Sequence, residues 1–148
     1  MTPPESHDDL IVRGIAEAMH AAGAGTWRPT GTYQEGETAI TVGALPASPA
    51  RAVALTTYGS EDDPVLADSL VMVQATIRGT TDPRTVNATA AALFDLLHGR
   101  TGFTLAGVPV ILARRVSWAR LGRDEGGRWR RSENYYLNTH HPSAHRTF

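Results

Sequence analysis

Two segments of the chain carry apolar residues at the spacing of an amphipathic helix. The first apolar stripe is formed by Ile11, Ile15, Ala18, Met19 and Ala22. The second is formed by Val86, Ala90, Leu93, Phe94 and Leu97. Ser6 precedes the first stripe and Asp82-Pro83 precedes the second, and these residue types start helices. We therefore predict one helix over residues 6–22 and another that begins at Pro83 and ends at His98-Gly99.

Alternation of apolar and polar residues predicts strands elsewhere in the chain. The strands are expected at residues 38–42, 52–58, 70–77, 108–118 and 129–137. Residues 124–127 have the composition of a turn, so the last two strands should form a hairpin. Three adjacent acids at 61–63, followed by Pro64, cannot be buried without partners, which predicts an exposed loop at 61–64.

The order of these elements predicts an α+β fold. We expect a single domain over residues 1–148, with a mostly antiparallel four- to five-stranded sheet and two helices packed on one face. Residues 138–148 lack periodicity and are expected to form an extended C-terminal tail.

The composition of the chain excludes several classes of chemistry. The 148 residues include no cysteine and no lysine, which excludes disulfides, thiolate metal sites and lysine-based catalysis. No apolar run has the length of a membrane span, and the N-terminus lacks the pattern of a secretory signal, so we expect synthesis in the cytoplasm. No serine, aspartate or glutamate lies in a recognisable catalytic context, and we predict that the protein is not an enzyme.

Charge is distributed unevenly along the chain. Residues 1–70 contain ten acids and three arginines, whereas residues 71–148 contain five acids and eleven arginines. Unlike surfaces of this kind could pair head to tail between copies, or the basic side could bind a nucleic acid or an acidic partner. Alternatively, the charges interleave in the folded chain and cancel.

Two clusters of side chains are candidates for binding. His140, His141 and His145 are close in sequence, but no helix supports metal-ligand spacing, and we interpret them as tail or interface residues. Seven arginines lie within residues 114–131, interspersed with aromatic residues: Arg114, Arg115, Arg120, Arg123, Arg128, Arg130 and Arg131. No nucleic-acid-binding motif accompanies them, so a protein interface is favoured over DNA binding. We predict no metal and no cofactor.

Several segments together resemble a known family. They are residues 45–58, residues 73–79 leading into 82–84, the helix at 90–99 and residues 123–135. Over residues 8–136 the chain resembles the minor capsid, or tail-terminator-like, proteins of long-tailed bacteriophages, particularly those that infect high-GC actinobacteria.

This resemblance implies a structural role in the virion. Such proteins form a six-fold ring on the head-proximal end of the tail tube, stop its polymerisation and dock to the head connector, while DNA passes through the lumen. The expected partners are further copies of the chain, the tail tube protein and a connector or stopper protein. An adaptor or stopper of the neck, or a DNA-binding module, remains an alternative.

Within this ring, the arginines of the C-terminal hairpin are expected to meet acids of the next subunit. The arginines are Arg114, Arg115, Arg128, Arg130 and Arg131. The acids are Glu61, Asp62, Asp63 and Asp68. The tail residues expected to contact a neighbouring ring or tube subunit are His140, His141, His145 and Phe148.

Overall fold

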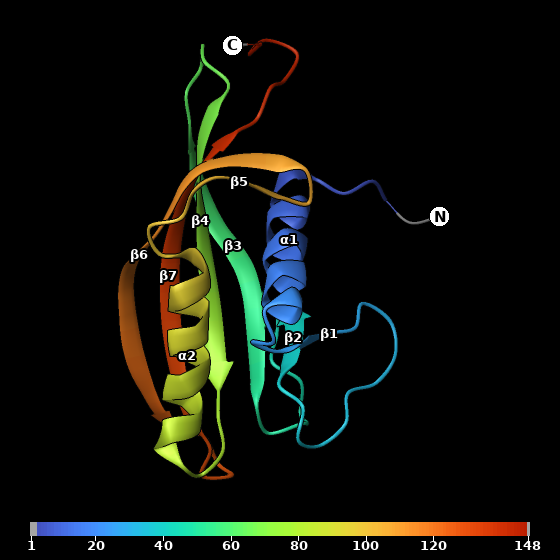
Figure 1. Cartoon of the computed structure of the whole chain (residues 1–148), viewed down its shortest axis with the longest axis vertical. Helices are drawn as coiled ribbons and strands as arrows, with labels where there is room; N and C mark the ends of the chain where they lie inside the picture. Colours follow the sequence, from blue (N-terminus) through green and yellow to red (C-terminus); the bar gives the residue numbers. More distant parts are fainter. Residues whose placement is uncertain (1–2, 148) are drawn as a thin grey trace.

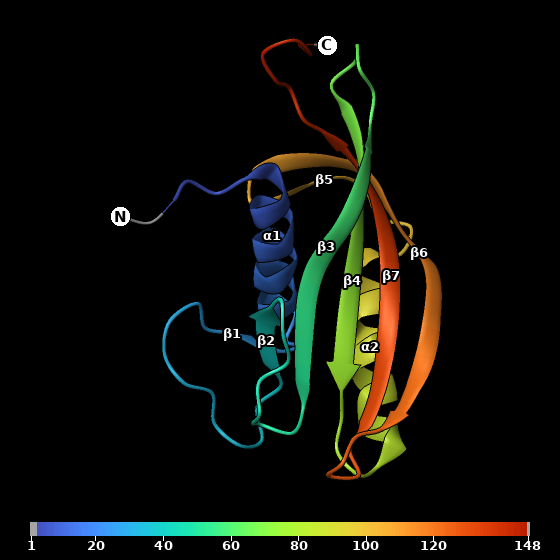
Figure 2. The ribbon, with the colours of Figure 1, turned by 180° about the vertical axis from the view of Figure 1, so that it is seen from behind.

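The computed structural model describes residues 3–147. Its helices are α1 (His7–Ala21) and α2 (Pro83–Leu97). Its strands are β1 (Thr26–Trp27), β2 (Ala39–Val42), β3 (Ala52–Asp62), β4 (Asp68–Arg78), β5 (Thr101–Leu105), β6 (Val108–Arg123) and β7 (Trp129–His140). Both helices lie in front of the sheet in Figure 1 and behind it in Figure 2, so they cover the same face.

The helices begin where the sequence predicts. The Ser6 side chain accepts a hydrogen bond from the Asp9 backbone, and the Asp9 side chain accepts one from the Ser6 backbone, which completes a capping box. The Asp82 side chain caps α2 in the same way by accepting from the Arg84 backbone, with Pro83 as the first helical residue. Both predicted helices are confirmed.

The sheet is larger than predicted. It has seven strands in the order β1-β2-β3-β4-β7-β6-β5, and β2 is parallel to both β1 and β3. The α+β class is confirmed, whereas the expected four to five strands are wrong and the sheet is mixed. The two missed strands are short: β1 has two residues, and β5 has five, of which Phe103 and Leu105 are the apolar ones.

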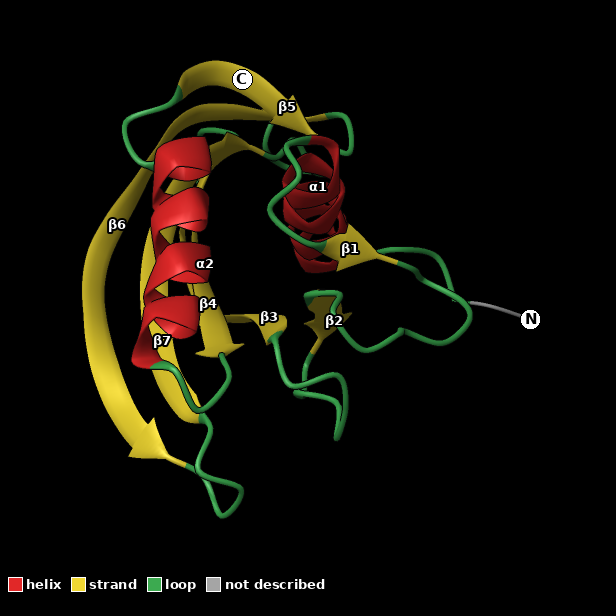
Figure 3. Ribbon diagram, turned by 60° about the horizontal axis from the view of Figure 1, so that its bottom comes forward, coloured by secondary structure: helices red, strands yellow, loops and turns green. Residues whose placement is uncertain are grey.

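The core lies between the concave face of the curled sheet and the helices (Figure 3). Alternate residues of β4 point into it, in agreement with the predicted pattern, and Tyr135 and Leu137 of β7 pack beside them. Leu93 of α2 and Ile15 of α1 are fully buried against this face. The register between β6 and β7 shifts at several points, and bulges of this kind bend a sheet.

The β3 and β4 strands continue beyond the helices as a hairpin, residues 57–70, which we call the arm (Figure 2). The end of β7 still pairs with β4 there, from Asp68 to Leu70. Glu61 and Asp62 are paired with Leu70 and Ser69 within this arm, so the predicted loop at 61–64 is wrong for its first half. Both acids are nonetheless exposed, because the arm stands clear of the helices. Exposure was inferred correctly, but exposure does not require a loop.

Candidate interaction surfaces

The arm carries all four acids predicted to lie at an interface. Asp62 accepts hydrogen bonds from the Ser60 hydroxyl at 2.8 Å and the Ser69 hydroxyl at 2.6 Å. Asp63 accepts from the backbone N–H groups of Val65 and Leu66, at 2.8 and 2.6 Å, and so shapes the turn. These bonds stabilise the charged carboxylates and lower the pKa of both aspartates.

The acids of the arm have no arginine or histidine within ion-pair distance in the part of the chain that the structure covers. Glu61 and Asp68 are exposed. The turn between the strands adds two exposed apolar side chains, Val65 at 66% and Leu66 at 45%. The arm therefore presents carboxylates that form no ion pair, and a small apolar tip.

The C-terminal segment, residues 141–147, braces the arm through Arg146. This buried guanidinium donates to the backbone carbonyls of Asp63 at 3.0 Å and Asp68 at 3.1 Å, and to the Ser69 hydroxyl at 3.1 Å. The His141 carbonyl accepts another of its bonds, at 2.8 Å. The arginine thus binds carbonyls rather than carboxylates, and the charge of the acids stays available.

The predicted tail residues occupy different environments. His140 ends β7, and His145 is exposed. The His141 ring stacks on the His7 ring, with centroids 3.8 Å apart. Phe148 lies outside the described residues.

The arginines predicted at the interface lie on the β6–β7 hairpin, and three of them bind acids of their own chain. Arg115 and Arg131 hold the two oxygens of Glu133, at 3.1 and 3.2 Å. Glu133 is completely buried, and the sequence interpretation overlooked it. Arg128 pairs with Asp124 across the turn at 2.9 Å.

Other arginines of the hairpin have no carboxylate partner among the described side chains. Arg114 lies over the Tyr136 ring, 5.3 Å from its centroid, and Arg130 donates to the Leu121 carbonyl. Arg120 and Arg123 lie over tryptophan rings, at 5.1 and 5.4 Å. The last two belong to the predicted arginine cluster but not to the predicted interface set.

The arm acids and the hairpin arginines do not meet within one chain. The strand order places β4 and β7 between β3 and β6. Within residues 3–147, no ion pair joins an acid of the arm to an arginine of the hairpin. The four acids of the arm and the arginines of the β6–β7 hairpin therefore lie in separate regions of the fold.

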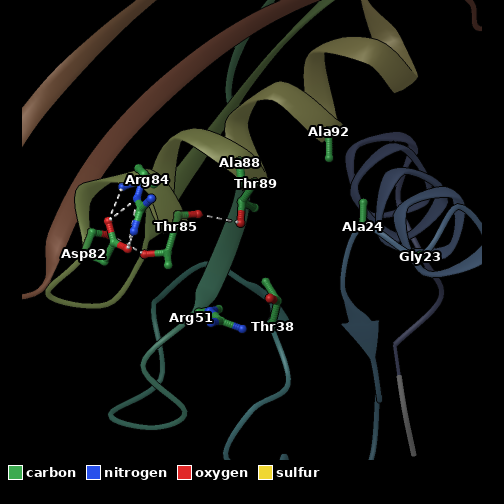
Figure 4. A pocket seen from close by; sticks show the side chains of 10 residues that line it. All are labelled: Gly23, Ala24, Thr38, Arg51, Asp82, Arg84, Thr85, Ala88, Thr89 and Ala92. Carbon is green, nitrogen blue, oxygen red and sulfur yellow. Dashed lines mark hydrogen bonds and ion pairs between the residues drawn. The ribbon is translucent and has the colours of Figure 1, made fainter.

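An open pocket lies between the end of α1 and the first half of α2 (Figure 4). Asp82 in its wall is engaged with Arg84 at 2.8 Å, and this contact, with the helix cap, lowers the pKa of Asp82. Small residues such as Ala24, Ala88 and Ala92 form much of the lining.

Residues 3–147 contain neither a metal-binding cluster nor a membrane-spanning helix. No group of three His, Cys, Asp or Glu side chains is placed to hold a metal ion. Neither helix is long and apolar enough to cross a membrane.

Comparisons with known proteins find one family and a solved structure of similar fold. Residues 18–140 match the family model described as bacteriophage tail terminator protein. Among solved structures, a chain of the virion of a native gene transfer agent (GTA) particle superposes with a TM-score of 0.52 at 16% sequence identity. The superposition covers 70% of this chain and 79% of that chain and shows a shared fold. No curated protein matches the sequence.

Proposed function

The chain belongs to the bacteriophage tail terminator protein family, and from this premise we propose that it forms a ring on the head-proximal end of the tail tube. The ring stops polymerisation of the tube and joins the tail to the head. The family match over residues 18–140 is the observation that carries this proposal.

The charge distribution supports assembly into a ring. An acidic arm and a basic hairpin on separate regions of one subunit favour heterologous contacts, in which unlike surfaces meet and a closed ring can form. Of the predicted arginines, Arg114 and Arg130 are the ones that have no carboxylate partner among the described residues. We expect these two, rather than the arginines bound to Glu133 and Asp124, to meet acids such as Glu61 and Asp68 of a neighbouring subunit.

Electron microscopy of particles from a phage that lacks this gene tests the proposal. Overlong tails without heads, beside filled heads, are the expected result. Tails of normal length that fail to attach to heads would instead assign the protein to the neck, as an adaptor or stopper. Intact infectious particles would contradict a role in the virion.

Binding of duplex DNA would support the rival interpretation of the arginines. A DNA-binding module should shift DNA at low salt and release it as salt is raised. The internal pairing of Arg115, Arg128 and Arg131 leaves fewer arginines available for phosphates, and we expect no retained complex at low salt.

A further inference from the structure

The outer edge of β6 is open over its second half. β5 pairs with β6 only between Val108 and Leu112, and Gly99 and Arg100 then exchange backbone hydrogen bonds with Ala113. From residue 116 to residue 123, no strand lies on this side of β6 in the part of the fold that is described. Most of these residues are exposed, and an unpaired strand edge of this length is a template for another strand.

The opposite side of the sheet has a second open edge, in β3. β2 pairs with β3 only from Ala52 to Leu55, and the Gly43 N–H ends the contact by donating to the Leu55 carbonyl. The arm's β3 residues, 57–62, have β4 on one side and, within residues 3–147, no strand on the other. Each subunit thus has two unsatisfied strand edges at opposite sides of one sheet.

We propose that the open edge of β6 in one copy pairs with the open edge of β3 in the next copy, so that the sheet continues between subunits. This inference rests on the proposed ring and specifies how its subunits are joined. β3 runs antiparallel to β4, β4 to β7 and β7 to β6, so β6 and β3 run in opposite directions. If the sheet continues with the same face toward the helices, the new pair is antiparallel, as its neighbours are.

The charges of the two edges select this partner over the alternatives. Pairing β6 with β6 of another copy would place Arg120 and Arg123 against the same arginines. Pairing β3 with β3 would oppose Glu61 and Asp62 to their own copies. Only the β6–β3 combination brings opposite charges together, and that combination is heterologous and can close into a ring.

The two open edges lie at different positions along the strand direction, and this adds a geometric requirement. Thr56 pairs with Gln74, which pairs with Asn134, which pairs with Ser117, so Thr56 and Ser117 lie at the same level of the sheet. The open part of β3 lies on one side of this level and most of the open part of β6 on the other. The offset is about six residues, or about 20 Å at the usual rise per residue. In a closed ring, tilted strands accommodate a stagger of this kind.

Two charge-reversed variants test the pairing in the purified full-length chain. The arm variant carries Glu61→Arg and Asp62→Arg, and the hairpin variant carries Arg120→Glu and Arg123→Glu. Each variant alone has like charges on both of its edges, so it should remain monomeric in native mass spectrometry while keeping the circular dichroism of the wild type. An equimolar mixture should assemble with the two variants alternating, because each acidic edge then meets a basic one.

The control variant carries Arg51→Glu and Arg100→Glu, which change net charge by the same amount as the hairpin variant. Both arginines are exposed, and neither lies on an open edge. The control should assemble as the wild type does. Loss of assembly in the control would mean that net charge, rather than the two edges, governs association.

Hydrogen exchange distinguishes strand pairing from attraction between surfaces. Amides within 57–62 and 117–123 should gain protection when the wild type assembles. Assembly without added protection in either segment overturns the inference, as does a mixture that fails to assemble. If only one of the two variants loses assembly, the edge altered in the other variant takes no part in the contact, and β6–β3 pairing is wrong.

The outcomes separate this inference from the proposed function. Overlong tails in the gene-deleted phage, together with variants that each assemble alone, leave the function standing and remove the pairing. Alternating assembly of the variants, together with normal particles from the gene-deleted phage, would support the pairing and contradict the proposed function. A wild-type chain that stays monomeric at every concentration overturns both the ring and the pairing.

Discussion

The basic hairpin and the acidic arm hold their charges in different ways. In the hairpin, Arg115 and Arg131 share the completely buried carboxylate of Glu133. In the arm, Asp62 and Asp63 are bound by hydroxyl and amide groups, which carry no charge. The hairpin holds one carboxylate inside the fold between two arginines, whereas the arm carries its carboxylates without ion pairs.

This difference separates two roles that a charged residue can have. A buried ion pair is costly to break, because the remaining partner is left uncompensated in a region that water does not reach. An exposed carboxylate contributes little to stability but sets the potential that a partner meets. We therefore expect substitutions in the hairpin network to change folding and substitutions in the arm to change association.

Replacing Glu133 tests the first half of this contrast and should have the largest effect. Glu133→Gln leaves Arg115 and Arg131 close together without a carboxylate, and we expect a loss of about 3–5 kcal/mol in the free energy of unfolding. Equilibrium urea unfolding measures it. Glu125→Gln, in the exposed turn of the same hairpin, is the matched control and should lie within about 0.5 kcal/mol of the wild type. A loss below about 1 kcal/mol for Glu133→Gln would show that the ion pairs of Glu133 do not stabilise the fold.

Replacing Arg146 tests whether the arm is held from outside by the C-terminal segment. Arg146→Met keeps the apolar stem and removes donors to the carbonyls of Asp63, Asp68 and His141. We expect a loss of about 1–3 kcal/mol, because half-buried carbonyls lose the donors that Arg146 supplies. Hydrogen exchange should accelerate in the arm and in residues 141–147 and stay unchanged in α2. Uniform acceleration across the chain would contradict a local brace.

Lowering the pH should reduce the stability of the folded chain through His7. Burial, and then the stacked His141, lower the pKa of His7 below its ordinary value, and Arg146 acts in the same direction, while Asp8 and Asp62 oppose them. The folded chain therefore prefers neutral His7. Its contribution to stability is complete above about pH 6.5 and declines as the pH falls toward the lower pKa of the folded state.

Urea unfolding at pH 7.5 and pH 5.0 measures this contribution. The wild type should lose more stability between the two pH values than His7→Gln, which cannot titrate at this position. Equal losses in the two proteins would show that His7 is not responsible. Asp62 does not confuse the measurement, because its pKa lies below its ordinary range and it stays ionised at both pH values.

The helices and the central strands were predictable because their signals are local. Ser6 and Asp82-Pro83 mark helix starts through bonds to residues two or three positions away, and the alternation in β4 reflects one face on the core. β1 was missed because two residues cannot display a period, and β5 because it offers only two apolar residues, Phe103 and Leu105; both strands form against neighbouring strands.

The predicted interface residues stay predictions, and the sequence left open whether the charges separate or interleave in the fold. The structure places the four arm acids apart from the hairpin arginines. No local pattern shows that Glu133 lies between Arg115 and Arg131, because the contact with Arg115 depends on the register of β6 on β7. The open edges of β3 and β6 are equally invisible, since they depend on where β2 and β5 stop.

The smallest effect on stability is expected at the tip of the arm. Val65 and Leu66 are 66% and 45% exposed, so replacing both by serine removes little buried surface. We expect the free energy of unfolding to change by less than about 0.5 kcal/mol in urea unfolding. The turn should keep its shape, because Asp63 binds the backbone N–H groups of both residues rather than their side chains. A loss above about 1 kcal/mol would show that the tip packs against its own chain, and the arm would then be no freer than the hairpin.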